Sequence, residues 1–169
     1  DIDVAQDGFA PVHTLRLKGA PAPHLTLTAY GYMAELAREA LTRLAFEHEI
    51  FCELVVPTQL APLSASGGLE TSLAASLEHS GRLLTIEEGT YSLGWGAEQV
   101  ARAAQHLGSR LLAARRVAAT EAPIPAARSL EEAALPSVER ILTTAREMVY
   151  SQHVASAGCP RSAHQSQRN

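Results

Sequence analysis

The fold is decided by residues 25–56, which read LTLTAYGYMAELAREALTRLAFEHEIFCELVV. Leu25–Tyr30 is rich in β-forming residues and stops at Gly31, and Phe51–Val56 is a nearly unbroken apolar run. Between them, apolar residues recur at the three- and four-residue spacing of one buried helix face: Met33, Leu36, Ala37, Ala40, Leu41, Leu44 and Ala45. The segment therefore predicts a strand, a crossover helix and a second strand parallel to the first.

The same alternation continues along the chain. We expect a short helix from about Thr71 to His79, a strand over Arg82–Glu87, a helix that ends at Gly108, a strand over Arg115–Thr120 and a last helix from about Pro136. Residues 12–18 alternate weakly, which indicates an edge strand. The pattern predicts a Rossmann-like α/β fold: a three-layer αβα sandwich whose mostly parallel five-stranded sheet has one antiparallel edge strand.

Residues 12–149 are predicted to form this one domain. Residues 1–11 lack periodicity and are interpreted as a linker. Residues 150–169 contain no acidic residue and are dominated by Gln, Ser, His and Arg, so we expect a disordered tail.

Composition excludes several classes of function. The net charge is −4 and the 14 basic residues are scattered, so no basic patch for nucleic acid is expected. The pair Arg115–Arg116 is interpreted as solvated surface charge. No run approaches the roughly 20 apolar residues of a membrane span. The acidic start at Asp1 and Asp3 is unlike a signal peptide, and together with two widely separated cysteines it favours a cytoplasmic protein.

The segment 87–98, EEGTYSLGWGAE, is the most informative candidate site, because ligands of such sheets bind beyond the carboxyl ends of the strands. The residues of this candidate interface or loop site are Glu87, Glu88, Gly89, Tyr91, Gly94, Trp95 and Gly96. The N–H groups at the start of the following helix suit an anion. The spacing is neither a Walker loop nor a full dinucleotide fingerprint, so we favour a rigid packing turn.

Adjacent strand residues point to opposite faces, so Glu87 and Glu88 are not expected to converge as an acid/base pair. One carboxylate should make a capping or interface contact and the other should be solvated. Tyr91 and Trp95 mark a partner surface if exposed and ordinary core if buried.

The sequence contains no convincing catalytic set. Its seven histidines show no metal-ligand spacing, and those at 48, 79 and 106 lie near predicted helix ends. There is no nucleophile elbow, and Cys52 lies within an apolar run. We therefore assign no catalytic, cofactor-binding or metal-binding residue to this chain.

Six short motifs nevertheless follow one another in a familiar order: TAYGYM at 28–33, GRLLTIEEG at 81–89, GWGAE at 94–98, RV at 116–117, PIP at 123–125 and LPSV at 135–138. Together they make residues 12–149 resemble the C-terminal, transketolase-like domain of the β subunit of thiamine-diphosphate-dependent 2-oxo acid dehydrogenases. The family commonly has Asp-Leu-Arg-Thr-Leu where residues 56–60 read VPTQL, so that charged pair is absent here. An acid that helps some members dock on the acyltransferase core is also missing from residues 110–114, RLLAA.

The resemblance implies a part of an E1 component that does not catalyse by itself. Thiamine diphosphate and Mg²⁺ would be held in the assembled enzyme by other domains. Partners would be the remaining E1 domains or subunits and the lipoyl-bearing acyltransferase core, in a homo- or hetero-oligomer. Two alternatives stay open, a stand-alone interaction module and a small-molecule-binding regulatory domain that uses the loop 89–96.

Overall fold

The strand–helix–strand unit at residues 25–56 forms the centre of a six-stranded sheet in the computed structural model, which describes residues 1–7, 12–61 and 69–155. The strand order is β1-β2-β4-β3-β5-β6. The strands are β1 (Ile2–Asp7), β2 (Val12–Leu17), β3 (Leu25–Ala29), β4 (Cys52–Pro57), β5 (Arg82–Thr90) and β6 (Ala113–Ala119). The helices are α1 (Tyr32–His48), α2 (Thr71–Ser80), α3 (Trp95–Leu107), η1 (Gly108–Arg110), α4 (Arg128–Ala134) and α5 (Val138–Ala155).

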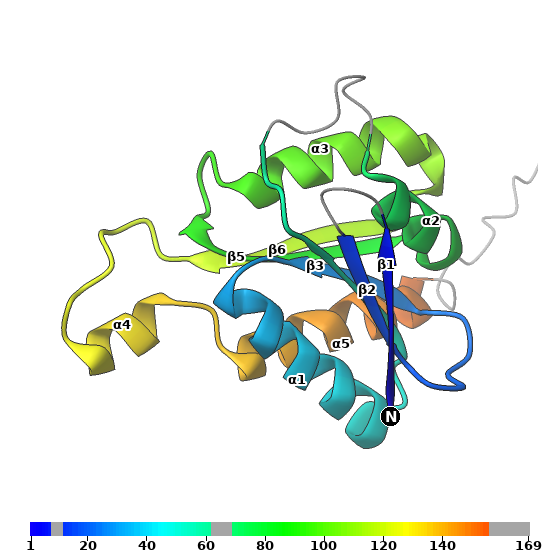
Figure 1. Ribbon diagram of the computed structural model, residues 1–169, viewed down its shortest axis with the longest axis horizontal. Coiled ribbons are helices and arrows are strands. Elements are labelled where there is room, and N and C mark those ends of the chain that lie inside the picture. The colour runs from blue at the N-terminus through cyan, green and yellow to red at the C-terminus, as the bar shows by residue number, and fades with distance from the viewer. Residues whose placement is uncertain (8–11, 62–68, 156–169) are drawn as a thin grey trace, which may run out of the picture.

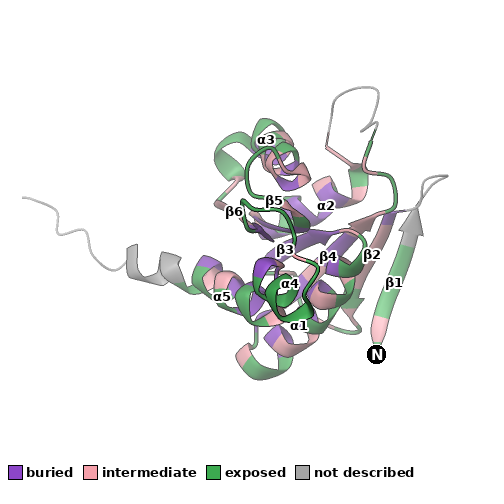
Figure 2. Ribbon diagram, turned by 90° about the vertical axis from the view of Figure 1, so that its left-hand side faces the viewer, coloured by how far each residue is buried: buried purple, intermediate pink, exposed green. Residues whose placement is uncertain are grey.

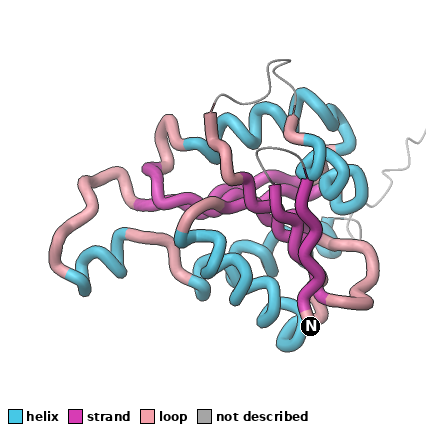
Figure 3. The backbone as a smooth tube through the Cα atoms, viewed as in Figure 1, coloured by secondary structure: helices cyan, strands magenta, loops and turns pink. Residues whose placement is uncertain are grey.

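The sheet is parallel from β4 through β3 and β5 to β6, as the alternation of strands and helices predicts. Helices α1 and α5 cover one face and α2 and α3 the other, which gives the three layers (Figure 1 and Figure 3). The α/β sandwich predicted from the sequence is confirmed. Its central strand β3 is buried throughout, so the core lies on both sides of it.

The antiparallel side of the sheet has two strands rather than the single edge strand predicted. The interpretation of residues 1–11 as a linker is wrong for β1, which pairs with β2 in the register Ile2↔Leu17 to Asp7↔Val12. The sheet therefore has six strands instead of five. Residues 1–5 are mostly exposed (Figure 2), so β1 lacks the burial pattern that would reveal a strand in the sequence. Its conformation comes from hydrogen bonding to β2.

Alternation along β3 sorts its side chains between two different kinds of packing. Leu25, Leu27 and Ala29 belong to the apolar cluster beneath α1 and α5. Burying a leucine of this kind contributes about 1.5–3 kcal/mol. Thr26 points to the other face, where its hydroxyl is hydrogen-bonded to Ser76 at 2.8 Å and to Ser80 at 2.7 Å, both on α2. One helix pair is therefore held by apolar contacts and α2 partly by hydroxyls.

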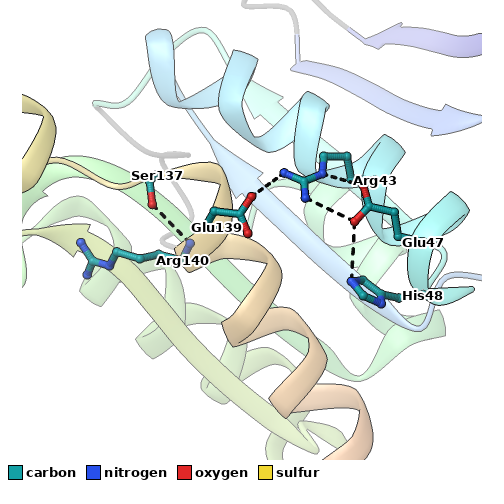
Figure 4. Close-up of polar contacts among 6 residues, drawn as sticks. All are labelled: Arg43, Glu47, His48, Ser137, Glu139 and Arg140. Atoms are coloured by element: carbon teal, nitrogen blue, oxygen red, sulfur yellow. Dashed lines mark hydrogen bonds and ion pairs between the residues drawn. The ribbon is translucent and has the colours of Figure 1, made fainter.

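Helix α1 buries the face that its periodicity predicts. Six of the seven residues named for that face are buried: Met33, Ala37, Ala40, Leu41, Leu44 and Ala45. The helix ends at His48, and the next residue, Glu49, has a left-handed backbone that lets the Ile50 N–H reach the Leu44 carbonyl at 3.0 Å. Arg43 on the outer face contacts Glu47 at 2.7 Å and Glu139 of α5 at 2.6 Å (Figure 4). The hydrogen bond from Arg43 lowers the pKa of Glu47.

The C-terminal boundary of the domain is later than predicted. Helix α5 continues to Ala155, past the expected start of a tail at residue 150. Residues 156–169, for which a disordered tail is expected, lie outside the described residues, and so does Cys159.

Candidate interface and loop site

The carboxyl ends of β3, β5 and β6 meet at one edge of the sheet, because these three neighbouring strands are parallel. The loop from β5 to α3 lies at this edge, together with the segment that leads from β6 to α4 (Figure 1). Strand β5 is longer than predicted and reaches Thr90, after which the loop is short. All seven candidate residues lie in the end of β5, in this loop or in the first turn of α3.

Glu87 and Glu88 differ completely in exposure. The Glu87 side chain is 0% exposed, whereas Glu88 is exposed, as expected from the alternation of strand side chains. Glu87 faces α3 on the same side as Leu83 and Thr85. The two carboxylates therefore do not form an acid/base pair.

Glu87 caps the start of α3 and forms a buried ion pair. The Gly96 N–H donates to Glu87 Oε2 at 3.0 Å, and Arg116 Nη2 donates to Glu87 Oε1 at 2.8 Å. The N-terminus of a helix favours an anion, because its free N–H groups and its dipole point toward it. The anion here belongs to the chain itself. This geometry supports the packing-turn interpretation over an external ligand.

Arg116 is not the solvated charge expected from the pair Arg115–Arg116. Its side chain is only 11% exposed, and its guanidinium also lies over the Tyr91 ring, 4.5 Å from the ring centroid. Arg115 points to the other face and meets Glu147 of α5 with side chains that are 50% and 52% exposed. The prediction was correct for Arg115 and wrong for Arg116.

Positions 94 and 96 have no room for a side chain, so only glycine fits at Gly94 and Gly96 without a shift of neighbouring atoms. A Cβ at Gly96 would lie 2.4 Å from Thr85 Oγ1 and 2.5 Å from Glu87 Oε1. At Gly94 it would lie 2.4 Å from the Thr90 carbonyl oxygen and 2.6 Å from Glu87 Oε2. The glycines let the backbone approach the buried carboxylate closely.

The aromatic residues of the loop differ in exposure. Tyr91 is 54% exposed, and Leu93 beside it is fully exposed with a positive φ of 57°. Trp95 is half-buried and packs edge-on against Tyr30, with ring centroids 5.1 Å apart. Tyr91 thus meets the condition for a partner surface, and Trp95 is part of the packing.

Tyr30, which follows β3, is close enough to Glu87 and Glu88 for their charges to perturb its hydroxyl. Desolvation raises the pKa of Tyr30, and the negative charges of Glu87 and Glu88 raise it further. Gly89 is close by, since a Cβ there would lie 3.8 Å from Tyr30 Oη and 3.4 Å from Glu87 Oε2. The hydroxyl therefore stays protonated to higher pH than that of an ordinary tyrosine, and it is a weaker acid.

Other residues that could take part in chemistry lie at helix ends or in the core. His48, His79 and His106 lie in the last turns of their helices, as predicted. Cys52 is buried, and burial raises the pKa of its thiol. Within residues 1–7, 12–61 and 69–155, no three His, Cys, Asp or Glu side chains gather as a metal site would require. Among these residues no helix combines the length and apolar character needed to cross a bilayer.

A shallow depression of about 290 Å³ lies between β6 and α5 and borders the candidate site at Arg116. It is lined by Arg116, Val117, Glu139, Arg140, Thr143 and Thr144. Glu139 is already bound to Arg43, as Figure 4 shows, and Arg140 donates to the Ala118 carbonyl at 3.3 Å. The charged groups of this depression are thus engaged within the chain.

Residues 16–141 of this three-layer α/β domain match the family described as "Transketolase, C-terminal domain". The chain belongs to this family, which confirms the resemblance drawn from its motifs. It is 31% identical over 119 residues to the 3-methyl-2-oxobutanoate dehydrogenase subunit beta of Mycobacterium tuberculosis, covering 70% of this chain and 32% of that protein. It is likewise 31% identical over 127 residues to the mitochondrial pyruvate dehydrogenase E1 component subunit beta-1 of Arabidopsis thaliana, covering 75% and 33%.

A third relative extends the range of activities among the proteins that share this domain. The acetoin:2,6-dichlorophenolindophenol oxidoreductase subunit beta of Bacillus subtilis is 31% identical, with 74% of this chain and 35% of that protein covered. A solved structure, "Split gene transketolase, inactive beta4 tetramer", has a TM-score of 0.59 at 20% identity and covers 77% of this chain and 39% of that one, which shows the fold alone. The chain thus spans about a third of the length of the curated relatives it matches.

Proposed function

We propose that this chain acts as the C-terminal domain of the β subunit of a thiamine-diphosphate-dependent 2-oxo acid dehydrogenase. It contributes to subunit assembly and partner docking during oxidative decarboxylation and does not catalyse alone. The single observation that carries this proposal is the family match over residues 16–141 to the domain found in the β subunits of such enzymes. Two features of the structure support it: exposed apolar side chains, and a helix start that already holds a carboxylate.

The first feature is a set of exposed apolar side chains. A domain that belongs in an assembly should expose apolar groups where its partner binds. Tyr32 follows β3, Tyr91 and Leu93 follow β5, and Ile124 and Leu130 follow β6, and each of them is about half exposed or more. These five side chains lie in segments that follow the carboxyl ends of β3, β5 and β6. Val4, Phe46, Leu112 and Tyr150 are also exposed but lie in other parts of the described chain, so five of these nine apolar side chains follow the carboxyl ends of strands. This majority supports an assembly surface over a stand-alone module with a polar surface.

The second feature is the start of α3, which bears on where the cofactor binds. Diphosphate needs free N–H groups or cations, and Mg²⁺ needs oxygen ligands beside them. Here the helix start that would suit a phosphate already holds the Glu87 carboxylate, whose charge repels a second anion. The residues present do not fit thiamine diphosphate, so the proposal assigns the cofactor and Mg²⁺ to the other domains of the assembled enzyme. The same carboxylate weighs against a regulatory ligand site at the loop 89–96.

A chimera tests the assembly role. The matched C-terminal region of the Mycobacterium tuberculosis β subunit is replaced by this chain, and the product is co-expressed with the corresponding α subunit. We expect an α/β complex by light scattering and 2-oxo-acid-dependent reduction of an artificial electron acceptor, whereas the β subunit truncated before that region should give neither. A folded chimera that fails to assemble would contradict the proposal.

Two measurements on the isolated chain complete the test. Calorimetric titration with thiamine diphosphate and Mg²⁺ should show no binding, and no 2-oxo acid should be turned over. A micromolar dissociation constant would show that the chain carries a cofactor site of its own.

A further inference from the structure

We infer that the turn between β5 and α3 is a carboxylate-binding site whose ligand is the chain's own Glu87 side chain. The inference does not rest on the proposed function. It says what the Glu87 carboxylate does in this fold, where it takes the place that an external anion occupies in many α/β domains. The intact chain is thereby closed to small anions at this turn.

The two donors of the site come from α3 and β6, and the carboxylate that they bind comes from β5. The Gly96 N–H at the start of α3 donates to one carboxylate oxygen, and Arg116 of β6 donates to the other. Each oxygen therefore has its own donor, as in the recognition of a free carboxylate. The carboxylate is 0% exposed, so bulk solvent does not reach it.

Two further polar atoms indicate capacity for an anion beyond the two bonds made. Thr85 Oγ1 is fully buried and has no hydrogen-bond partner among the described residues, and the same holds for Arg116 Nε. Thr85 Oγ1 and Glu87 Oε1 lie 2.4 and 2.5 Å from one point, the Cβ position that Gly96 leaves empty. A buried hydroxyl thus lies next to the carboxylate without being used by it.

Replacing Glu87 by alanine removes a CH₂–COO⁻ group, which has the size and shape of acetate. The variant Glu87→Ala should therefore leave an acetate-sized cavity that still contains the Gly96 N–H, the Arg116 guanidinium and the Thr85 hydroxyl. Acetate is the probe that the geometry selects.

The experiment compares thermal unfolding of the wild-type chain, Glu87→Ala and Glu88→Ala in sodium acetate and in sodium chloride of equal ionic strength. Glu88 is the matched control, because it is the adjacent carboxylate and is exposed. We expect acetate to raise the Tm of Glu87→Ala saturably and to leave the other two chains as they are in chloride. With a dissociation constant of about 10 mM, about 0.5 M acetate would raise the folding equilibrium constant about 50-fold.

Equal responses of Glu87→Ala and Glu88→Ala to acetate would overturn the inference. If Glu87→Ala does not fold in chloride, its refolding yield from urea in acetate and in chloride gives the same decision, and a yield that acetate does not raise also overturns it. Line broadening of ¹³C-labelled acetate provides a direct readout. Broadening with Glu87→Ala and none with the wild-type chain supports an internal ligand, and equal broadening contradicts it.

Discussion

Replacing Arg116 by methionine removes the cation that faces Glu87 and keeps most of the volume of the side chain. The Glu87 carboxylate would then remain fully buried with only the Gly96 N–H as a donor. Removing one partner of a buried ion pair costs about 3–5 kcal/mol, because the other charge stays desolvated. For a domain of this size the expected fall in Tm is about 6–20 °C.

The neighbouring arginine provides a matched control on the same strand. Arg115 and Glu147 are each about half exposed, so Arg115→Met should lower the free energy of unfolding by about 0–1 kcal/mol. Urea unfolding can be followed through the single tryptophan of the chain, Trp95, which lies in the same loop site, and through far-ultraviolet circular dichroism. Adding Glu87→Gln to Arg116→Met should restore part of the loss, because it removes the uncompensated charge.

A similar fall in the free energy of unfolding for Arg116→Met and Arg115→Met would refute this reasoning. The result would mean that Glu87 finds water or another donor when Arg116 is absent, and that the pair does not hold the loop against the sheet. A double variant no more stable than Arg116→Met would show that charge burial is not the cause.

Three other predictions follow from the same contacts. Gly96→Ala should lower the free energy of unfolding by about 1–2 kcal/mol despite the better helix propensity of alanine, because the new Cβ meets Thr85 Oγ1 at 2.4 Å; urea unfolding measures this, and Thr85→Ala in the same chain should recover part of it. The pKa of Tyr30 is raised from 10.0, so the neutral phenol is favoured in the folded state and stability should be lost as the pH rises above that value. In an ultraviolet titration of tyrosinate, Tyr30→Phe should remove the step at highest pH, and an unchanged profile would count against the shift. In a Cys159→Ser background, Cys52 should react with a thiol reagent only as fast as the chain unfolds, since burial raises the pKa of its thiol; fast labelling of the folded chain would contradict its placement.

The sequence was sufficient where burial imposes a local period. The apolar face of α1 and the buried runs of β3 and β5 follow from spacing alone. In these elements, the side on which a residue lies decides whether it is apolar. The opposite orientations of Glu87 and Glu88 follow from the same alternation. These features need no knowledge of distant parts of the chain.

Partners far apart in sequence could not be predicted. Alternation places Glu87 toward α3, but it does not say that Arg116, 29 residues later, is the group that meets it. The same limit applies to β1, which is recognisable as a strand only from its pairing with β2 in the structure. Tyr91 and Trp95 look equivalent in the sequence, and only the position of Arg116 and Tyr30 around them separates an exposed ring from a packed one.

The hydroxyl contacts between Thr26 and α2 give the two faces of the sheet different tolerance to substitution. Apolar side chains beneath α1 and α5 attract one another without direction, so Leu, Ile and Met can replace one another there with small shifts of the helices. Ser76 and Ser80 must keep short, directional bonds to one threonine oxygen, which fixes how far α2 slides along its axis. An aliphatic residue at either position would remove one of the two hydrogen bonds to Thr26, so α2 would be held along the strands only by the remaining hydroxyl bond and by its apolar contacts.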